Sequence, residues 1–230
     1  MEINNSSQKS KYLHGTVVVG IVCKDCVIIG ADQLMSAGYY PLFFDKKKIF
    51  SLNKYCYCAF TGVVSTIKET VDILRAELKL NELSNRKVII ESIASLAGIL
   101  LKERNADDSN GGAVGLIAGY DSKPQLFDID RRGAIDKAKY SASMSSGIFQ
   151  ATTILDENYH DNMTEQEGIE LCVRAIQEAK RRAPGVGGFS MDVAIINKQG
   201  SREISQKEIN AILVKNKNYL LQKEREISKQ

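Results

Sequence analysis

The chain has 230 residues, of which 43% are hydrophobic and 26% charged, a composition typical of one large globular domain. Its net charge of +3 is too small to indicate nucleic-acid binding, and no basic patch with interleaved aromatic residues is present. No apolar run is long enough to span a membrane, and the first 15 residues lack the apolar core of a secretory signal, so we expect a cytoplasmic protein.

Alternating and continuous apolar runs predict eight strands. They cover residues 17–22, 26–31, 48–52, 55–60, 113–120, 125–129, 134–143 and 191–197. The first two are joined by the short polar turn Lys24-Asp25 and are expected to form a hairpin. The segment 32–44, which contains Gly38 and Pro41, is expected to be a loop.

Apolar residues three and four positions apart, together with capping boxes, predict five helices. They are marked by the apolar faces Ile67-Val71-Leu74-Leu78 and Ile89-Ile93-Leu96-Ala97-Leu100, by residues 148–159, and by the helix starts Thr164-Glu167 and Ser205-Glu208. The order is strands, two helices, strands, two helices, a strand and a helix. It predicts an α+β fold in which two antiparallel sheets face each other and helix pairs cover the outer faces.

Thr16 stands immediately before the first predicted strand, at the start of a run of β-branched residues, and is the candidate nucleophile. It follows a polar leader, residues 1–15, that ends in the unhindered Gly15. Cleavage of the Gly15–Thr16 bond would give Thr16 both a hydroxyl nucleophile and a free α-amine, whose reference pKa of about 7.7–8 suits a general base. Threonine is also a good strand former, so this stretch alone leaves a structural role open.

Three further residues are candidates to assist Thr16. Asp32 ends the second strand at the edge where Thr16 begins the first. Lys48 belongs to a run of three lysines that cannot all face solvent, because side chains alternate along a strand, and an inward lysine would tune nearby pKa values. Gly62, between a strand and a helix, offers an unhindered N–H for an oxyanion hole. A turn aspartate, a solvated lysine and a helix-entry glycine are the structural alternatives.

The chain has five cysteines, an odd number, and the spacing of four of them could suit a zinc site. A non-proteolytic zinc-binding module that uses Cys23, Cys26, Cys56 and Cys58 is therefore an alternative function. All four fall in stretches patterned as strands, where free cysteine behaves as a small hydrophobic residue, so we expect neither a metal site nor a disulfide. Cys172 falls on the apolar face of a predicted helix and is expected in the core.

Short motifs occur in a fixed order from Gly15 to about Ile212. They are Gly15-Thr16-Val-Val-Val-Gly20, Gly30-Ala-Asp32, Lys48-Ile-Phe50, Ala59-Phe-Thr-Gly62, Ser145-Ser-Gly147, Leu155 to Tyr159, Met163-Thr164, Arg174-Ala-Ile176, and Gly187-Gly188 before Met191-Asp-Val-Ala-Ile. In this order and at these separations the sequence resembles proteasome β subunits of archaeal type, a family of N-terminal-nucleophile threonine proteases. The resemblance implies a four-layer αββα sandwich.

The resemblance implies a role for each candidate residue. Thr16 Oγ attacks the carbonyl of Gly15, and hydrolysis of the ester frees the α-amine, so the chain would be a zymogen that cleaves itself. Thr16 then attacks peptide bonds of unfolded proteins and forms an acyl-enzyme. Lys48 lowers the proton affinity around the nucleophile, and Asp32 holds Lys48 in place.

The resemblance also implies an oxyanion donor, a supporting serine and a specificity pocket. The Gly62 N–H stabilises the oxyanion, and Ser146 hydrogen-bonds the α-amine and its water. The pocket for a substrate side chain would be lined by Met35, Lys46, Phe60 and Val64, and the bulk of Phe60 predicts that it is shallow. No metal and no organic cofactor is implied.

Two positions depart from the family pattern. When the chain is aligned on Gly187-Gly188, Ala183 and Val186 stand where the family has an aspartate and a serine that support the nucleophile and the lysine. Neither side chain can form a hydrogen bond, and loss of such support can slow a site by orders of magnitude. A non-catalytic or weakly active structural β subunit is therefore an alternative.

The resemblance implies partners and a division of the chain. Family members form stacked heptameric rings with proteasome α subunits and other β subunits, and an ATPase regulator contacts them through the α rings. Their substrate is unfolded polypeptide, and we expect no nucleic-acid partner and no membrane partner. We expect a leader over residues 1–15, a proteasome β-type domain over 16–214 and a charged C-terminal helical extension over 215–230. An unassembled chain is expected to keep its leader and stay inactive.

Overall fold

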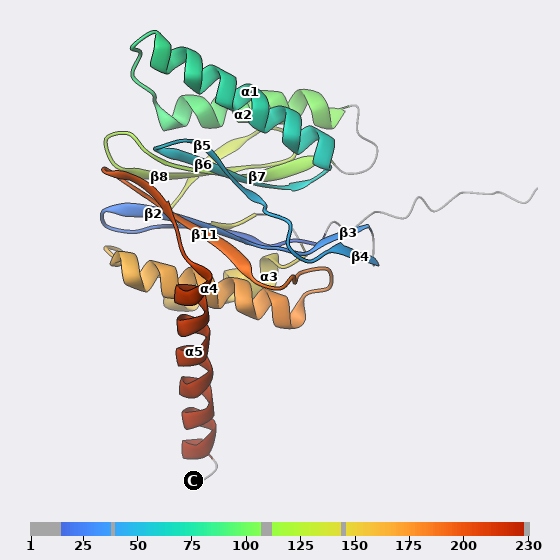
Figure 1. Cartoon of the computed structure of the whole chain (residues 1–230), viewed down its shortest axis with the longest axis vertical. Helices are drawn as coiled ribbons and strands as arrows, with labels where there is room; N and C mark the ends of the chain where they lie inside the picture. Colours follow the sequence, from blue (N-terminus) through green and yellow to red (C-terminus); the bar gives the residue numbers. More distant parts are fainter. Residues whose placement is uncertain (1–14, 38–39, 107–111, 144–145, 228–230) are drawn as a thin grey trace, which may run out of the picture.

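The computed structural model describes residues 15–37, 40–106, 112–143 and 146–227, with the side chains of the last helix described as far as Asn216. Figure 1 shows four layers in the order helices, sheet, sheet, helices, with the last helix projecting from the body. This arrangement confirms the predicted α+β sandwich with two antiparallel sheets between helical layers.

The first sheet has five antiparallel strands in the order β10-β1-β2-β11-β12. Their bounds are β1 Val18–Val22, β2 Cys26–Asp32, β10 Tyr140–Ala142, β11 Met191–Asn197 and β12 Gly200–Glu203. β1 and β2 form the predicted hairpin, with Val18 opposite Ala31. Every residue of β2 is buried, because this central strand lies between the second sheet and a helical layer, which explains its continuous apolar sequence.

The second sheet is a five-stranded antiparallel meander in the order β5-β6-β7-β8-β9. Its strands are β5 Ile49–Asn53, β6 Cys56–Gly62, β7 Ala113–Tyr120, β8 Pro124–Ile129 and β9 Ile135–Ala138. A separate two-stranded hairpin, β3 Met35–Ala37 and β4 Tyr40–Phe43, lies beside the sandwich.

Two helix pairs cover the outer faces of the sheets (Figure 1). α1 Val64–Leu83 and α2 Ile90–Ala106 cover the second sheet, α3 Ile148–Asn158 and α4 Glu165–Arg182 cover the first, and α5 Gln206–Ile227 ends the chain. Both predicted capping boxes are present. At the start of α4, Glu167 N donates to Thr164 Oγ1 at 3.3 Å while Thr164 N donates to Glu167 Oε2 at 2.8 Å. Ser205 and Glu208 make the same reciprocal pair before α5.

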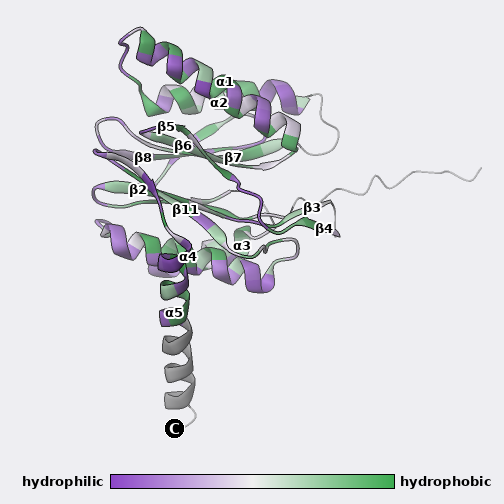
Figure 2. Ribbon diagram, in the orientation of Figure 1, coloured by the Kyte–Doolittle hydropathy of each residue, from purple (hydrophilic) through white to green (hydrophobic). Residues whose placement is uncertain are grey.

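Apolar side chains fill the three interfaces between the layers, and Figure 2 shows the hydrophobic residues on the inward faces of the helices and along the strands. Cys23, Cys26 and Cys172 lie in the core between the first sheet and its helices. Cys56 and Cys58 lie in the core on the far side of the second sheet. The four cysteines of the zinc alternative are therefore in different layers and cannot bind one ion. Across the described ranges, no three metal-binding side chains cluster together.

Several local predictions were wrong. The expected loop over 32–44 contains the β3–β4 hairpin, although Gly38 within it lies outside the described residues. The single strand expected over 134–143 is two strands, β9 and β10, that pair in different sheets and are separated by Lys139. The pattern is continuous, so only the choice of partner strand reveals the break. β12 was not predicted at all.

Helix ends differ from the sequence pattern in smaller ways. Ile89 precedes α2 and is 50% exposed, and Ile90 takes the buried position instead. α5 runs as one helix from Gln206 to Ile227, through most of the stretch for which a charged helical extension was expected. In the described part of the chain, no helix has the length and apolar character needed to cross a membrane.

Candidate active site

Thr16 and Asp32 lie together at one edge of the first sheet. Thr16 precedes β1 and Asp32 is the last residue of β2, and the antiparallel pairing of these strands brings the two residues side by side. Val17 N donates to Asp32 Oδ1 at 3.0 Å, and Asp32 N donates to Val17 O at 3.3 Å. Both residues are buried, with Asp32 completely removed from solvent.

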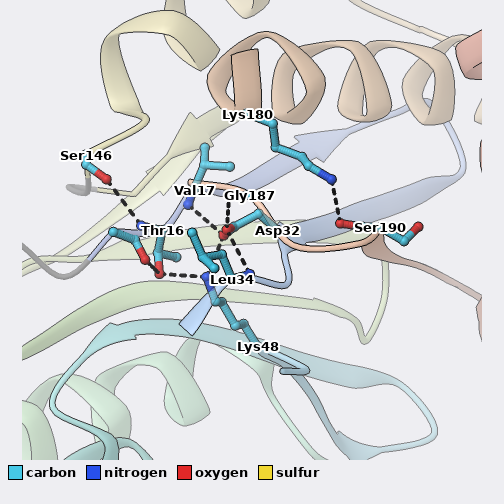
Figure 3. Close-up of polar contacts among 10 residues, drawn as sticks. Thr16, Val17, Asp32, Leu34, Lys48, Ser146, Lys180, Gly187 and Ser190 are labelled. Carbon is cyan, nitrogen blue, oxygen red and sulfur yellow. Dashed lines mark hydrogen bonds and ion pairs between the residues drawn. The ribbon is translucent and has the colours of Figure 1, made fainter. Parts of the chain in front are cut away.

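Lys48 reaches this edge from the second sheet, where it immediately precedes β5 (Figure 3). Its Nζ lies 2.8 Å from Thr16 Oγ1 and 2.6 Å from Asp32 Oδ1. Burial disfavours the ammonium form and lowers the pKa of Lys48 from its ordinary value, while the Asp32 carboxylate acts in the opposite direction. A lysine with a lowered pKa exchanges its proton more readily, so Lys48 is placed to relay the proton of the Thr16 hydroxyl.

Asp32 is held by four hydrogen-bond donors (Figure 3). Lys48 Nζ and Val17 N donate to Oδ1, and Leu34 N, at 3.2 Å, and Gly187 N, at 2.9 Å, donate to Oδ2. A buried carboxylate needs such partners to offset the loss of hydration. Each donor comes from a different place in the chain, so Asp32 ties the ends of β1 and β2 to Lys48 and to the loop before β11.

The Gly15–Thr16 bond lies within this arrangement. Thr16 Oγ1 is 2.5 Å from the Gly15 carbonyl oxygen, and Thr16 N donates to Ser146 Oγ at 3.3 Å. Gly15 packs against the loop after α4, and a Cβ atom at Gly15 would lie 2.1 Å from the carbonyl oxygen of Gly185, whose φ is +74°. Only glycine therefore fits before Thr16 in this conformation.

A cavity of about 590 Å³ opens beside Thr16. The four predicted pocket residues Met35, Lys46, Phe60 and Val64 all line it, together with Gly15, Thr16, Lys48 and Gly62. Gly62 ends β6 with φ +128°, and a Cβ atom there would lie 2.1 Å from Gly112 O, so this position requires glycine. The Gly62 N–H as oxyanion donor stays a prediction.

Ala183 and Val186 lie in the loop that connects α4 to β11, and both side chains are buried in apolar core. They contribute no polar group to the site. The backbone of the same loop does contribute, because Gly187 N donates to Asp32 and Gly187 O accepts from Gln33 N at 3.1 Å. The loop thus supports Asp32 through main-chain groups.

Sequence reasoning missed two kinds of contributor. Leu34 and Gly187 act through backbone N–H groups, which every non-proline residue has, so no residue pattern marks them. Lys180, in the last turns of α4, donates to Ser190 O at 2.9 Å, and burial lowers its pKa while the charge of Asp32 opposes that shift. Its position in the sequence is that of an ordinary helix-terminal cation, which gave no signal.

Comparisons with known proteins cover most of the chain. Residues 12–196 match the protein family described as "Proteasome subunit". The chain is 34% identical over 202 residues to "Proteasome subunit beta 1" of Thermococcus onnurineus, which covers 87% of this chain and 98% of that protein. It is 33% identical over 213 residues to "Proteasome subunit beta 2" of Pyrococcus abyssi, covering 90% and 98%. It is 30% identical over 207 residues to "Proteasome subunit beta" of Methanobrevibacter smithii, covering 89% and 98%.

Proposed function

Because this chain belongs to the family of proteasome β subunits, we propose that it is a catalytic subunit that hydrolyses peptide bonds of unfolded proteins, with Thr16 as the nucleophile. The observation that carries the proposal is the contact of Lys48 Nζ with both Thr16 Oγ1, at 2.8 Å, and Asp32 Oδ1, at 2.6 Å. Covalent catalysis commonly uses a nucleophile, a neighbouring group that exchanges its proton, and a third group that orients the second. Thr16, Lys48 and Asp32 match these three parts.

The first reaction would remove the leader. Thr16 Oγ attacks the carbonyl carbon of Gly15 as its proton passes to the neutral amine form of Lys48, which burial makes more accessible by lowering the pKa of Lys48. Lys48 then gives this proton to the departing Thr16 nitrogen as the C–N bond breaks. The product is an ester between Thr16 and Gly15. Water hydrolyses this ester, so the leader leaves with a C-terminal carboxylate and Thr16 keeps its hydroxyl and a free α-amine. The hydrogen bond from Thr16 Oγ1 to Gly15 O keeps the hydroxyl beside the bond that would break.

The same atoms would then act on substrate. A free α-amine has a reference pKa of about 7.7–8, so it can accept the Thr16 hydroxyl proton near neutral pH. Thr16 Oγ forms an acyl-enzyme with the substrate, the amine returns the proton to the leaving peptide nitrogen, and water releases the acyl group. Ser146 Oγ lies 3.3 Å from Thr16 N, which suits support of the amine, and Gly62 N–H would stabilise the oxyanion.

A structural β subunit is the second candidate, and it is favoured by Ala183 and Val186, whose apolar side chains replace supporting groups. Against it, Gly187 N donates to Asp32 from the same loop, so Asp32 is supported without those side chains. If the absence of an aspartate and a serine side chain at these positions limits the rate of peptide hydrolysis, Ala183→Asp combined with Val186→Ser should raise peptidase activity. An unchanged rate would count against this explanation of the two replacements.

Membership of the family implies assembly with other proteasome subunits in rings. We propose that the rings are heptameric, that they stack within rings of α subunits, and that an ATPase regulator acts through the α rings in the cytoplasm. Digestion would then take place in a closed chamber, and a subunit outside the particle would keep its leader.

The intact mass of the subunit from assembled particles separates the two candidates. The catalytic proposal predicts a chain that begins at Thr16 and is labelled by a threonine-directed inhibitor. A chain that still begins at Met1 and takes up no label would overturn the catalytic proposal and favour the structural one. Particles made with Thr16→Ala provide the reference mass for an unprocessed and unlabelled chain.

A further inference from the structure

The pocket beside Thr16 has an apolar interior. Phe50, Phe60, Ile67 and Val71 contribute to its walls, and Phe60 and Val71 are almost completely buried. These residues come from β5, β6 and α1, so the interior lies between the second sheet and its covering helix. Such walls favour the hydrocarbon part of a substrate side chain.

The charged residues that line the same pocket are mostly basic. They are Lys46, Lys47, Lys48, Lys68 and Arg75, against the single acidic residue Asp72. Three of the five have a carboxylate partner: Lys47 with Glu203 at 2.5 Å, Lys48 with Asp32 at 2.6 Å, and Arg75 with Asp72 at 3.9 Å. Within each of these three pairs the positive and the negative charge cancel.

The other two cations are not compensated. Lys46 Nζ lies 4.5 Å from the centre of the Phe43 ring, and within the described ranges neither Lys46 nor Lys68 pairs with a carboxylate. Lys46 precedes β5, whereas Lys68 is in the second turn of α1, so the two positive charges come from different elements. The pocket beside the nucleophile therefore carries two positive charges available to a ligand.

We propose that this pocket selects glutamate, and more weakly aspartate, as the residue whose carbonyl Thr16 attacks; the inference rests on the proposed function. The methylene groups of glutamate would pack on Phe60 and Val71, and the carboxylate would lie between Lys46 and Lys68. The apolar walls favour the methylene groups of a long side chain, and the two lysines favour a negative charge at its end, so glutamate satisfies both. A lysine in the substrate would meet like charge and be rejected.

The test uses assembled particles and four quenched fluorogenic peptides that differ only in the residue before the cut: glutamate, glutamine, leucine or lysine. Because the two lysines are exposed, each pair with the substrate contributes modestly, and we expect kcat/KM for glutamate to exceed that for glutamine by about fivefold. Lysine should give the lowest value. Salt at about 1 M should shrink the glutamate-to-glutamine ratio toward one and leave the leucine peptide much less affected.

A charge-reversal variant tests whether Lys68 is responsible for the preference for glutamate. Lys68→Glu should abolish the preference for glutamate and improve cleavage after lysine, whereas Lys79→Glu, on the same helix but outside the pocket, should preserve the parent ratios. Robust cleavage with glutamate no better than glutamine would overturn this inference and leave the proposed function standing. Failure to cleave any of the four peptides in assembled particles would overturn the proposed function and this inference with it.

Discussion

Replacing Asp32 by asparagine removes the charge opposite Lys48 and replaces one oxygen by a hydrogen-bond donor. The donors are distributed over both oxygens, so the new amide group must face either Lys48 and Val17 N or Leu34 N and Gly187 N. Two buried donors lose their acceptor in either orientation, at about 1–3 kcal/mol each. We therefore expect the free energy of unfolding to fall by about 4 kcal/mol, which is roughly a thousandfold in the equilibrium constant.

Denaturant-induced unfolding followed by circular dichroism measures this loss, and intact mass follows leader removal in the same variant. Asp192→Asn is the matched control, because Asp192 lies on β11 opposite Ala31, accepts one bond from Gln33, and has no partner on Oδ2 among the described residues. We expect the control to stay within about 1 kcal/mol of the parent and to process normally. An Asp32→Asn variant that matches this control in stability and processing would refute the reasoning.

Three further predictions concern the leader, the helix cap and the core. Gly15→Ala should block leader removal, because its Cβ would lie 2.1 Å from Gly185 O, and a mass spectrum that begins at Thr16 would contradict this. Hydrogen bonding from Thr164 lowers the pKa of Glu167, so the ionised Glu167 stabilises the protein above about pH 4.5, and this contribution is lost as the pH falls through the lower pKa of the folded state. The melting temperatures of Glu167→Gln and the parent should therefore converge in acid. A difference that stays constant with pH would count against the cap. Leu74→Ala should lower the free energy of unfolding by about 2–5 kcal/mol in a denaturant titration, because Leu74 is fully buried on the inward face of α1. A loss below about 1 kcal/mol would contradict this and mean that the core relaxes around the cavity.

Local sequence patterns predicted most of the fold. β7 and β11 have the bounds expected from their apolar runs, and the capping box at Thr164 marks the start of α4. The break between β9 and β10 could not be predicted, because it depends on two partner strands that belong to different sheets. Strand propensity is a property of the segment, whereas pairing is set by residues far away in the chain.

The candidate site shows the same division. Thr16, Asp32 and Lys48 were predicted from residue type and strand alternation together with the family resemblance, and the structure brings the three into direct contact. The backbone donors at Leu34 and Gly187 carry no signature in the sequence. The pocket position of residues on α1 depends on how that helix lies over β6, which is a tertiary relation that no local pattern contains.

The central claim is that Thr16 supplies both the attacking oxygen and, after leader removal, the base that accepts its proton. Digestion of an unfolded polypeptide by assembled particles that contain this chain as their sole β subunit tests it most directly. We expect Thr16→Ala to abolish digestion while the particles still assemble. Undiminished digestion by the alanine particles would contradict it.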